Sequence, residues 1–469
     1  MKGNDTAEMN DYNEKSMEYE KSLDSAYKKE LGIFYTSTKL AKKIIEFLNI
    51  PLESTIMDPC CGTGSFIISA ENLGYKNLFG ADIDSCAVKI CKKSSKLKNI
   101  EVLDTLGNSG SSVLRKVKSL QQVDYVIGNP PYAPISKDIQ VDTSDYLFLR
   151  DVKDSGSNLF IAALYRAFEL AKPTGMISYI IPKNFLHVAS YSLLRKKILK
   201  EKSIHSIIDI GACFKSVRGE QIILTLRNSY ERDNNFLIFK YENEEFVEKL
   251  KVKQDFYQDE ILLFDNKADY NIYQKLESSY KKFSDICTGY VGRGKSKQES
   301  AITGKDIRKF GFKNVNVPKK GNKVFIQNIY SAEAGIIASF AGELEATQTV
   351  TVFTDGDEKM CRYILGFLHS RLCNYYLIKF CYNSSRLTMH TDAKYLKKLP
   401  LIINEKTFSK IISIVKGLEV IEYMCDEWFE MIEDLNKLIY QTYNIEIEER
   451  NYIDLQIKSI QSKRWNNDK

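Results

Sequence analysis

The chain has 469 residues, 43% of them hydrophobic and 27% charged, with a formal net charge of +6; this is the composition of a globular protein long enough for two or three domains. No apolar run approaches the roughly 20 residues that span a bilayer, and the polar first residues lack the apolar segment of a secretion signal. The ten cysteines are scattered without a Cys-x-x-Cys pair, so we expect no disulfide framework, no metal site and a cytoplasmic location.

The predicted elements begin with a polar helical lead over residues 1–30. Over residues 31–239, short β-rich apolar runs alternate with helical patterns, which predicts an α/β domain with a mainly parallel sheet and helices on both faces. The clearest helix starts after Ser157 or Asn158 as cap and stops before Pro173, because its apolar residues recur at three- and four-residue steps. The expected strands lie in STIMDP, NLFGADID, NIEVLD, VDYVIGN, MISYIIP, SIIDIG and IILTLR.

The composition changes after about residue 275, where glycine and lysine become frequent. We therefore expect a first domain over residues 31–275, after the lead, and a second over residues 276–469. Residues 281–323 hold twelve Lys and Arg residues against three Asp and Glu. Such clustering suits contacts with nucleic-acid phosphates, and a solvated surface is the alternative.

The stretch IMDPCCGTGSFIISA, residues 56–70, predicts a strand ending at Asp58, a glycine loop and a helix from about Ser65. Glycines let the backbone approach a ligand closely, and a helix N-terminus carries partial positive charge. The stretch matches neither the dinucleotide nor the phosphate-loop pattern. An acid beside the loop argues against a bound polyphosphate, and Asp58 suits an ammonium group.

Two further acids follow the next two predicted strands. Asp82 lies twenty residues after Gly62, at the distance where Rossmann-like sheets place an acid that accepts hydrogen bonds from ribose hydroxyls. Asp104 ends the third strand and could accept from an adenine amino group. Three acids at successive strand ends, without phosphate chemistry, predict a nucleoside with a charged amino-acid tail, which is S-adenosylmethionine.

The stretch VIGNPPY, residues 126–132, ends a fourth strand on an amide followed by two prolines and a tyrosine. Proline fixes φ and removes an N–H donor, and it pushes the residue before it toward extended geometry. The segment therefore presents one amide and one aromatic face rigidly. Taken alone, a simple strand-ending turn is an equal alternative.

The order of GIFYTS, DPCCGTGSF, GADID, VLD and GNPPY, followed by a basic C-terminal region, resembles the gamma class of DNA adenine-N6 methyltransferases. The resemblance covers residues 30–240, and the C-terminal half more loosely. It implies a Rossmann-like S-adenosylmethionine-dependent methyltransferase sheet followed by a mixed α+β target-recognition domain. It also implies methylation of a flipped adenine in double-stranded DNA, in a restriction-modification or orphan modification role, by a monomer with a possible separate endonuclease.

The resemblance assigns catalysis to Asn129, Pro130, Pro131 and Tyr132. Hydrogen bonds from the adenine amine to the Asn129 side-chain oxygen and the Pro130 carbonyl would favour a tetrahedral nitrogen, which frees its lone pair to attack the methyl group. Rigid acceptors of this kind are the usual source of such catalysis. Tyr132 and Phe214 would stack on the flipped base, although Phe214 could instead be a core residue.

The same resemblance implies cofactor and DNA contacts. The cofactor set is Phe34, Tyr35, Thr36, Asp58, Pro59, Cys60, Gly62, Gly64, Asp82, Ile83, Asp104, Asn129, Pro131 and Phe160. The candidate DNA contacts are Arg293, Lys295, Lys297, Lys305, Arg308 and Lys309. Two alternatives remain open: a methyltransferase acting on a protein glutamine amide or an RNA guanine amine, and a non-catalytic DNA-binding subunit.

Overall fold

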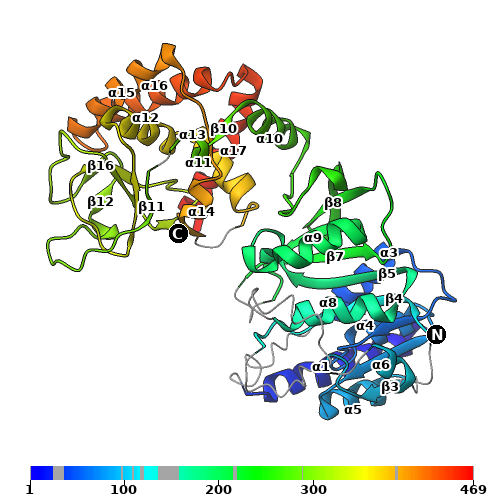
Figure 1. The fold of residues 1–469 in the computed structure, drawn as a ribbon. Coiled ribbons are helices and arrows are strands. Elements are labelled where there is room, and N and C mark those ends of the chain that lie inside the picture. Colours follow the sequence, from blue (N-terminus) through cyan, green and yellow to red (C-terminus); the bar gives the residue numbers. More distant parts are fainter. Residues whose placement is uncertain are drawn as a thin grey trace. The chain divides into compact units, whose positions relative to one another are not determined.

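A computed structural model describes residues 2–24, 36–96, 99–107, 110–116, 121–135, 158–214, 219–287, 289–385 and 389–467 (Figure 1). The chain divides into two compact units, Met1–Leu262 and Leu263–Lys469. The division precedes the expected boundary near residue 275, because the helix α10 (Lys267–Ser279) packs within the second unit, where its Asp269 accepts a hydrogen bond from Tyr375 at 2.5 Å. Within the described ranges, no helix is long and apolar enough to cross a membrane.

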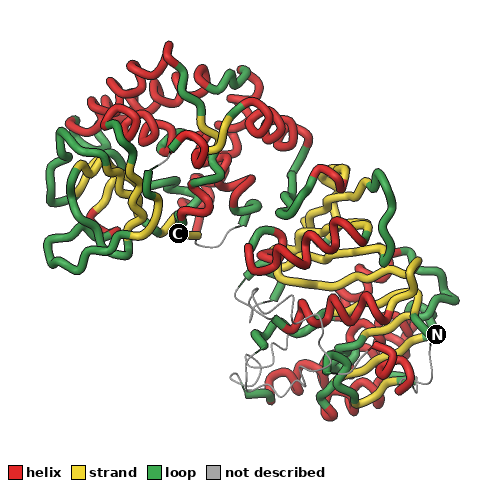
Figure 2. The backbone as a smooth tube through the Cα atoms, viewed as in Figure 1, coloured by secondary structure: helices red, strands yellow, loops and turns green. Residues whose placement is uncertain are grey.

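The first unit contains each expected strand, and further strands follow them after residue 234. The strands are β1 (Ile56–Asp58), β2 (Leu78–Asp82), β3 (Ile100–Val102), β4 (Val123–Gly128), β5 (Ala171–Pro182), β6 (Ser203–Gly211), β7 (Gln221–Arg227), β8 (Asn235–Glu242) and β9 (Glu245–Lys253). In the part of this unit that the structure describes, they form one nine-stranded sheet in the order β3-β2-β1-β4-β5-β7-β6-β8-β9. Figure 2 shows this sheet in yellow with helices in red on both sides.

The sheet is parallel in the half that carries the predicted motifs. β3, β2, β1, β4 and β5 all pair in parallel. β7 then pairs antiparallel with both β5 and β6, and β9 pairs antiparallel with β8. The mainly parallel sheet that the sequence predicts is therefore a mixed sheet beyond β5, since β7 returns between its two neighbours.

Helices cover both faces of this sheet. They are α1 (Lys2–Ser22), α3 (Thr38–Leu48), α4 (Ser65–Asn72), α5 (Ser85–Ser94), α6 (Gly110–Lys116), α8 (Leu159–Leu170) and α9 (Ser192–Glu201), with short 3-10 turns η1 (Lys183–Leu186), η2 (Ala189–Tyr191) and η3 (Gln254–Phe256). Helix α3 buries one apolar stripe in a core shared with α4 and the sheet. Figure 1 shows α8 and α9 on the opposite face. As predicted, the Asn158 side chain caps α8 by accepting from the Phe160 N–H at 3.2 Å.

The second unit combines short strands with helices, as expected for a mixed α+β domain. Its strands are β10 (Lys281–Lys282), β11 (Val291–Arg293), β12 (Ile307–Arg308), β13 (Gly311–Phe312), β14 (Lys323–Gln327), β15 (Ile329–Tyr330), β16 (Ala338–Gly342), β17 (Val350–Thr354), β18 (Met389–His390) and β19 (Pro400–Leu401). Its helices are α10, α11 (Phe283–Ile286), α12 (Glu358–Leu368), α13 (Arg371–Tyr376), α14 (Ala393–Leu396), α15 (Glu405–Val420), α16 (Asp426–Thr442) and α17 (Ile447–Asn467), with turns η4 (Gly304–Asp306) and η5 (Leu377–Cys381). β11, β17, β14 and β16 make an antiparallel sheet.

Candidate functional site

The predicted acids and the Asn-Pro-Pro-Tyr segment leave the sheet at one edge. β1 pairs in parallel with both β2 and β4, with Asp58 opposite Gly80 and Met57 opposite Val126. Asp82 pairs with Val102 of β3, so the loop carrying Asp104 starts at the same edge. The carboxyl ends of parallel strands are where open α/β sheets bind ligands, and the structure brings the candidate residues together there.

Asp58 lies directly against the start of the Asn-Pro-Pro-Tyr segment. Gly128 has φ +155°, and a Cβ there would lie 2.5 Å from Asp58 Oδ1. Only glycine suits that conformation and that close approach. Asp58 is 2% exposed and accepts from the Cys60 N–H at 3.1 Å. Burial, with a smaller contribution from the nearby Asp82 carboxylate, raises the pKa of Asp58 to about 8. A cation bound beside Asp58 would favour its charged form.

Asp82, the last residue of β2, binds the glycine loop through one carboxylate oxygen and the Asp84 backbone through the other. Its Oδ2 accepts from the Gly62 N–H at 2.7 Å, and its Oδ1 accepts from the Asp84 N–H at 2.9 Å. Burial raises the pKa of Asp82. The next side chain, Ile83, is 65% exposed. An acid beside an exposed aliphatic side chain suits a ribose next to the apolar face of a purine.

The glycine loop is fixed on several sides. Gly64 has φ +100°, and a Cβ there would lie 2.2 Å from the Cys91 sulfur of α5. Thr105 donates to the Pro59 carbonyl at 2.5 Å. Burial raises the pKa of the Cys60 thiol well above its usual value. Cys60 is therefore a neutral packing residue of the loop, without the thiolate that a nucleophile requires.

The loop after β3 is held by an arginine that the sequence analysis missed. The side chain of Asp104 accepts from the Leu106 N–H at 3.0 Å and the Gly107 N–H at 2.7 Å. Arg166 of α8 is almost fully buried, and its Nε donates to the Thr105 carbonyl at 3.0 Å. The sequence does carry a signal for Arg166, which is a single arginine on an otherwise apolar helix face. A buried guanidinium needs hydrogen-bond acceptors, so such a residue indicates a structural contact.

The Asn-Pro-Pro-Tyr segment folds back on itself. The Tyr132 hydroxyl donates to Asn129 Oδ1, and it lies 2.9 Å from the Ile180 carbonyl of β5. The Asn158 amide donates to the Tyr132 carbonyl at 2.9 Å. Burial raises the pKa of Tyr132 well above its usual value, so this hydroxyl stays a donor. An amide oxygen has two lone pairs, so Asn129 can accept from Tyr132 and from a second donor together.

Phe160 is fully buried under Tyr132. Its ring lies 5.2 Å from the Tyr191 ring, 6.1 Å from the Phe185 ring and 6.4 Å from the Tyr132 ring. Phe160 therefore belongs to a cluster of aromatic rings beside Tyr132. The contact of Phe160 with the cofactor adenine stays a prediction.

The remaining first-unit candidates have mixed environments. Phe214 is half-buried and packs against the core beneath the sheet, which agrees with either a core role or a stacking role. Thr36 is buried. Phe34 and Tyr35 lie outside the described residues.

An ion triad at the same edge was also missed by the sequence analysis. Lys183, just after β5, lies 2.8 Å from an Asp209 oxygen and 3.3 Å from a Glu220 oxygen. All three side chains are largely buried. Burial lowers the pKa of Lys183, but the two carboxylates outweigh this effect and raise it overall. The triad fixes the ends of β5 and β6 and the start of β7 relative to one another.

The candidate DNA contacts of the second unit differ in surroundings. The Arg293 guanidinium pairs with Asp392 at 2.7 Å. Lys295 lies over the Tyr290 ring, 5.5 Å from its centroid. A hollow of about 260 Å³ is lined by Tyr290, Arg293 and Lys295, together with Lys323 of β14. Basic and aromatic side chains around one hollow suit nucleic acid.

Four further candidates complete this set. Arg308 lies over the Tyr423 ring at 5.2 Å. Lys297 and Lys305 are exposed. Lys309 differs from them, because burial lowers its pKa to about 8. Lys309 is half-buried, and its contact with DNA stays a prediction.

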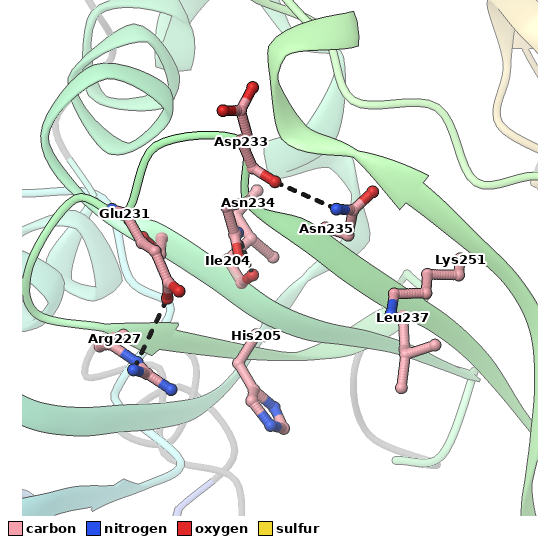
Figure 3. A pocket seen from close by; sticks show the side chains of 10 residues that line it. Ile204, His205, Arg227, Glu231, Asp233, Asn234, Asn235, Leu237 and Lys251 are labelled. Atoms are coloured by element: carbon pink, nitrogen blue, oxygen red, sulfur yellow. Dashed lines mark hydrogen bonds and ion pairs between the residues drawn. The ribbon is translucent and has the colours of Figure 1, made fainter.

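A larger hollow lies at the opposite edge of the first unit's sheet. Its volume is about 350 Å³, and its lining includes Ser203 and His205 of β6 and Asn235 of β8 (Figure 3). β6 and β8 begin here, whereas β1, β2 and β4 end at the acidic edge. Burial lowers the pKa of His205, and Arg227 lowers it further. This hollow is therefore separate from the predicted cofactor site.

Comparisons with known proteins find relatives among methyltransferases. Relatives include the type II methyltransferase M.VspI of Vibrio sp. (strain 343), which is 31% identical over 232 residues, covering 47% of this chain and 53% of the relative. The modification methylase CviBIII of Paramecium bursaria Chlorella virus NC1A is 28% identical over 196 residues, covering 40% of this chain and 47% of the relative. The chain thus spans about half the length of the curated relatives it matches.

One solved structure is similar over most of the chain. The type IIL restriction-modification enzyme MmeI in complex with DNA has a TM-score of 0.57 at 14% identity, covering 94% of this chain and 80% of that one. This likeness concerns the fold, and with the strand order it confirms the predicted Rossmann-like methyltransferase architecture. The model of the N-6 DNA methylase family matches residues 16–287. Because that match covers more than half of the sequence, the chain belongs to the N-6 DNA methylase family.

Proposed function

We propose that this chain is a site-specific, gamma-class DNA methyltransferase that acts on the exocyclic N6 amine of a flipped adenine in double-stranded DNA. S-adenosylmethionine supplies the methyl group when bound. The observation that carries the proposal is the direct approach of buried Asp58 to Gly128. It joins the acid predicted for the cofactor to the segment predicted for the target amine.

The cofactor side of the site uses the strand-end acids. Asp58 faces the cationic methionine end, Asp82 accepts from the ribose hydroxyls, and Asp104 accepts from the adenine amino group. Ile83 supplies an exposed aliphatic surface for the purine. Carboxylates favour the cationic, hydroxyl-bearing ligand over a polyphosphate, because like charges repel.

The target side of the site uses the Asn-Pro-Pro-Tyr segment. Asn129 Oδ1 and the Pro130 carbonyl accept the two hydrogens of the adenine amine and hold its nitrogen toward the methyl group. Tyr132, fixed by Asn129 and by the Ile180 carbonyl, orients the amide and offers its ring to the base. Stacking of this kind contributes about 1–3 kcal/mol per base, which offsets much of the few kcal/mol that flipping costs.

The second unit supplies target recognition in this proposal. Its hollow with Arg293 and Lys295, together with exposed Lys297 and Lys305, would contact the DNA backbone or base edges. In this proposal the protein is a monomer that acts either in a restriction-modification system, beside a separately encoded endonuclease, or as an orphan modification enzyme without one. The ten cysteines are free thiols, which fits the reducing cytoplasm.

The test expresses the full chain in a cell that lacks adenine methylation and sequences its DNA with detection of N6-methyladenine. We expect methylated adenines at one recurring sequence, and none with Asn129→Ala. Transfer of tritiated methyl groups to DNA, protein and RNA in parallel separates the alternatives. Label on protein or RNA alone would favour a glutamine-amide or guanine-amine substrate. DNA binding without any transfer would identify a non-catalytic subunit.

A further inference from the structure

Helix α1 reaches the glycine loop, although its sequence is polar and lies ahead of every motif used above. Tyr12 is 2% exposed, and its hydroxyl lies 3.2 Å from Ser65 Oγ and 3.3 Å from Thr63 Oγ1. Ser16 Oγ lies 2.7 Å from the same Thr63 oxygen. Thr63 stands between the two glycines of the loop and is fully buried. Two hydroxyls of α1 therefore hold the loop at its centre.

A second contact of α1 reaches Asp84, the neighbour of the acid predicted for the ribose. The Tyr19 hydroxyl donates to Asp84 Oδ2 at 2.5 Å. The other Asp84 oxygen caps α5, and the Asp84 N–H donates to Asp82 Oδ1. Tyr19 is thus connected to Asp82 through a single residue. A shift of Asp84 would move the backbone donor that orients the Asp82 carboxylate.

A third contact reaches the segment that follows GIFYTS. Thr38, the first residue of α3, donates through its hydroxyl to Asn13 Oδ1 at 3.0 Å. Helix α1 therefore contacts the glycine loop, the end of β2 and the start of α3, three parts that lie apart in the sequence. Burial raises the pKa of Tyr12, so its hydroxyl remains protonated and available for these hydrogen bonds.

We propose that Tyr12, Ser16 and Tyr19 are positioning residues of the S-adenosylmethionine site, which act through Thr63, Ser65 and Asp84. This inference rests on the proposed function, because it assumes that the glycine loop and Asp82 bind the cofactor. Its consequence is that cofactor affinity depends on hydroxyl groups of α1. The chemistry of methyl transfer should not depend on them, since Thr63, Ser65 and Asp84 all belong to the cofactor side of the site.

The test compares full-length wild type with Tyr12→Phe and Tyr19→Phe, which keep the rings and remove only the hydroxyls. Calorimetry without DNA gives the Kd for S-adenosylmethionine, and methylation assays give KM and kcat. We expect each variant to weaken binding about three- to tenfold, the factor that one ordinary hydrogen bond represents. KM for the cofactor should rise, while kcat at saturating cofactor stays within about twofold.

The matched control is Lys15→Ala. Lys15 is exposed on the same helix, and its described ion pair is with Asp11 of that helix, at 2.5 Å. This control should bind the cofactor as wild type does. An unchanged Kd in both tyrosine variants, or a fall in kcat without a rise in KM, would overturn the inference. If Tyr12→Phe does not fold, Tyr19→Phe decides alone, because its hydroxyl is only partly buried. A wild type that binds no cofactor would instead refute the proposed function.

Discussion

The burial of Asp58 makes the stability of the folded chain depend on pH. Burial raises its pKa from 3.8 to about 8, so between these values the folded chain without ligand keeps a proton that the unfolded chain releases. The contribution of Asp58 to stability is therefore most favourable at low pH and is lost as pH rises toward the folded pKa, by about 1.4 kcal/mol per pH unit. At pH 7 the accumulated loss is about 4 kcal/mol, a large share of the stability of an ordinary domain.

Asp58→Asn removes this ionisation and keeps a side-chain oxygen that can accept from the Cys60 N–H. The stability of the variant relative to wild type should therefore increase between pH 5 and pH 8. Urea unfolding of both full-length proteins, followed by circular dichroism at each pH, measures this difference. A difference that stays constant across the range would refute the buried proton.

The same proton should leave when a cationic ligand binds. Calorimetric titration of S-adenosylmethionine at pH 7, in buffers of different ionisation enthalpy, should show release of close to one proton by wild type. Asp58→Asn should bind more weakly and release none. Binding by wild type without proton release would show that the cation lies away from Asp58.

Three further predictions concern the target amine, the ribose and the DNA. Asn129→Ala should abolish transfer and keep the cofactor Kd, and turnover within tenfold of wild type would contradict its role. Asp82→Ala should weaken cofactor binding by roughly 1.5–3 kcal/mol, the range for hydrogen bonds to charged groups, because the ribose contacts and the link to the glycine loop are lost together. Calorimetry of cofactor binding measures this change. Lys297→Ala with Lys305→Ala should flatten the slope of log DNA affinity against log salt by about 0.9 per lost phosphate contact. Lys309→Ala should flatten that slope less than Lys297→Ala alone, since Lys309 is half-buried whereas Lys297 is exposed, and equal slopes for these two single variants would contradict the distinction.

The sequence by itself determined the elements that depend on local pattern. Apolar β-branched runs marked each strand through β7, and the glycine loop was recognisable after β1. The placement of Asp58, Asp82 and Asn129 at one edge followed from the same pattern, because parallel strands all present their carboxyl ends together. A helix capped by Asn158 was also readable, since capping depends on neighbours only two or three residues away.

Only the tertiary structure decided the contacts between segments that are distant in the sequence. The insertion of β7 between β5 and β6, the ion triad at Lys183 and the insertion of Arg166 into the loop after β3 all join residues tens of positions apart. The docking of Tyr12 on Thr63 is of the same kind. Such contacts follow from how whole elements pack, and a polar helix or a lone lysine has no periodicity that reveals its partner. The local pattern therefore located the reacting groups, whereas packing decided what holds them in place.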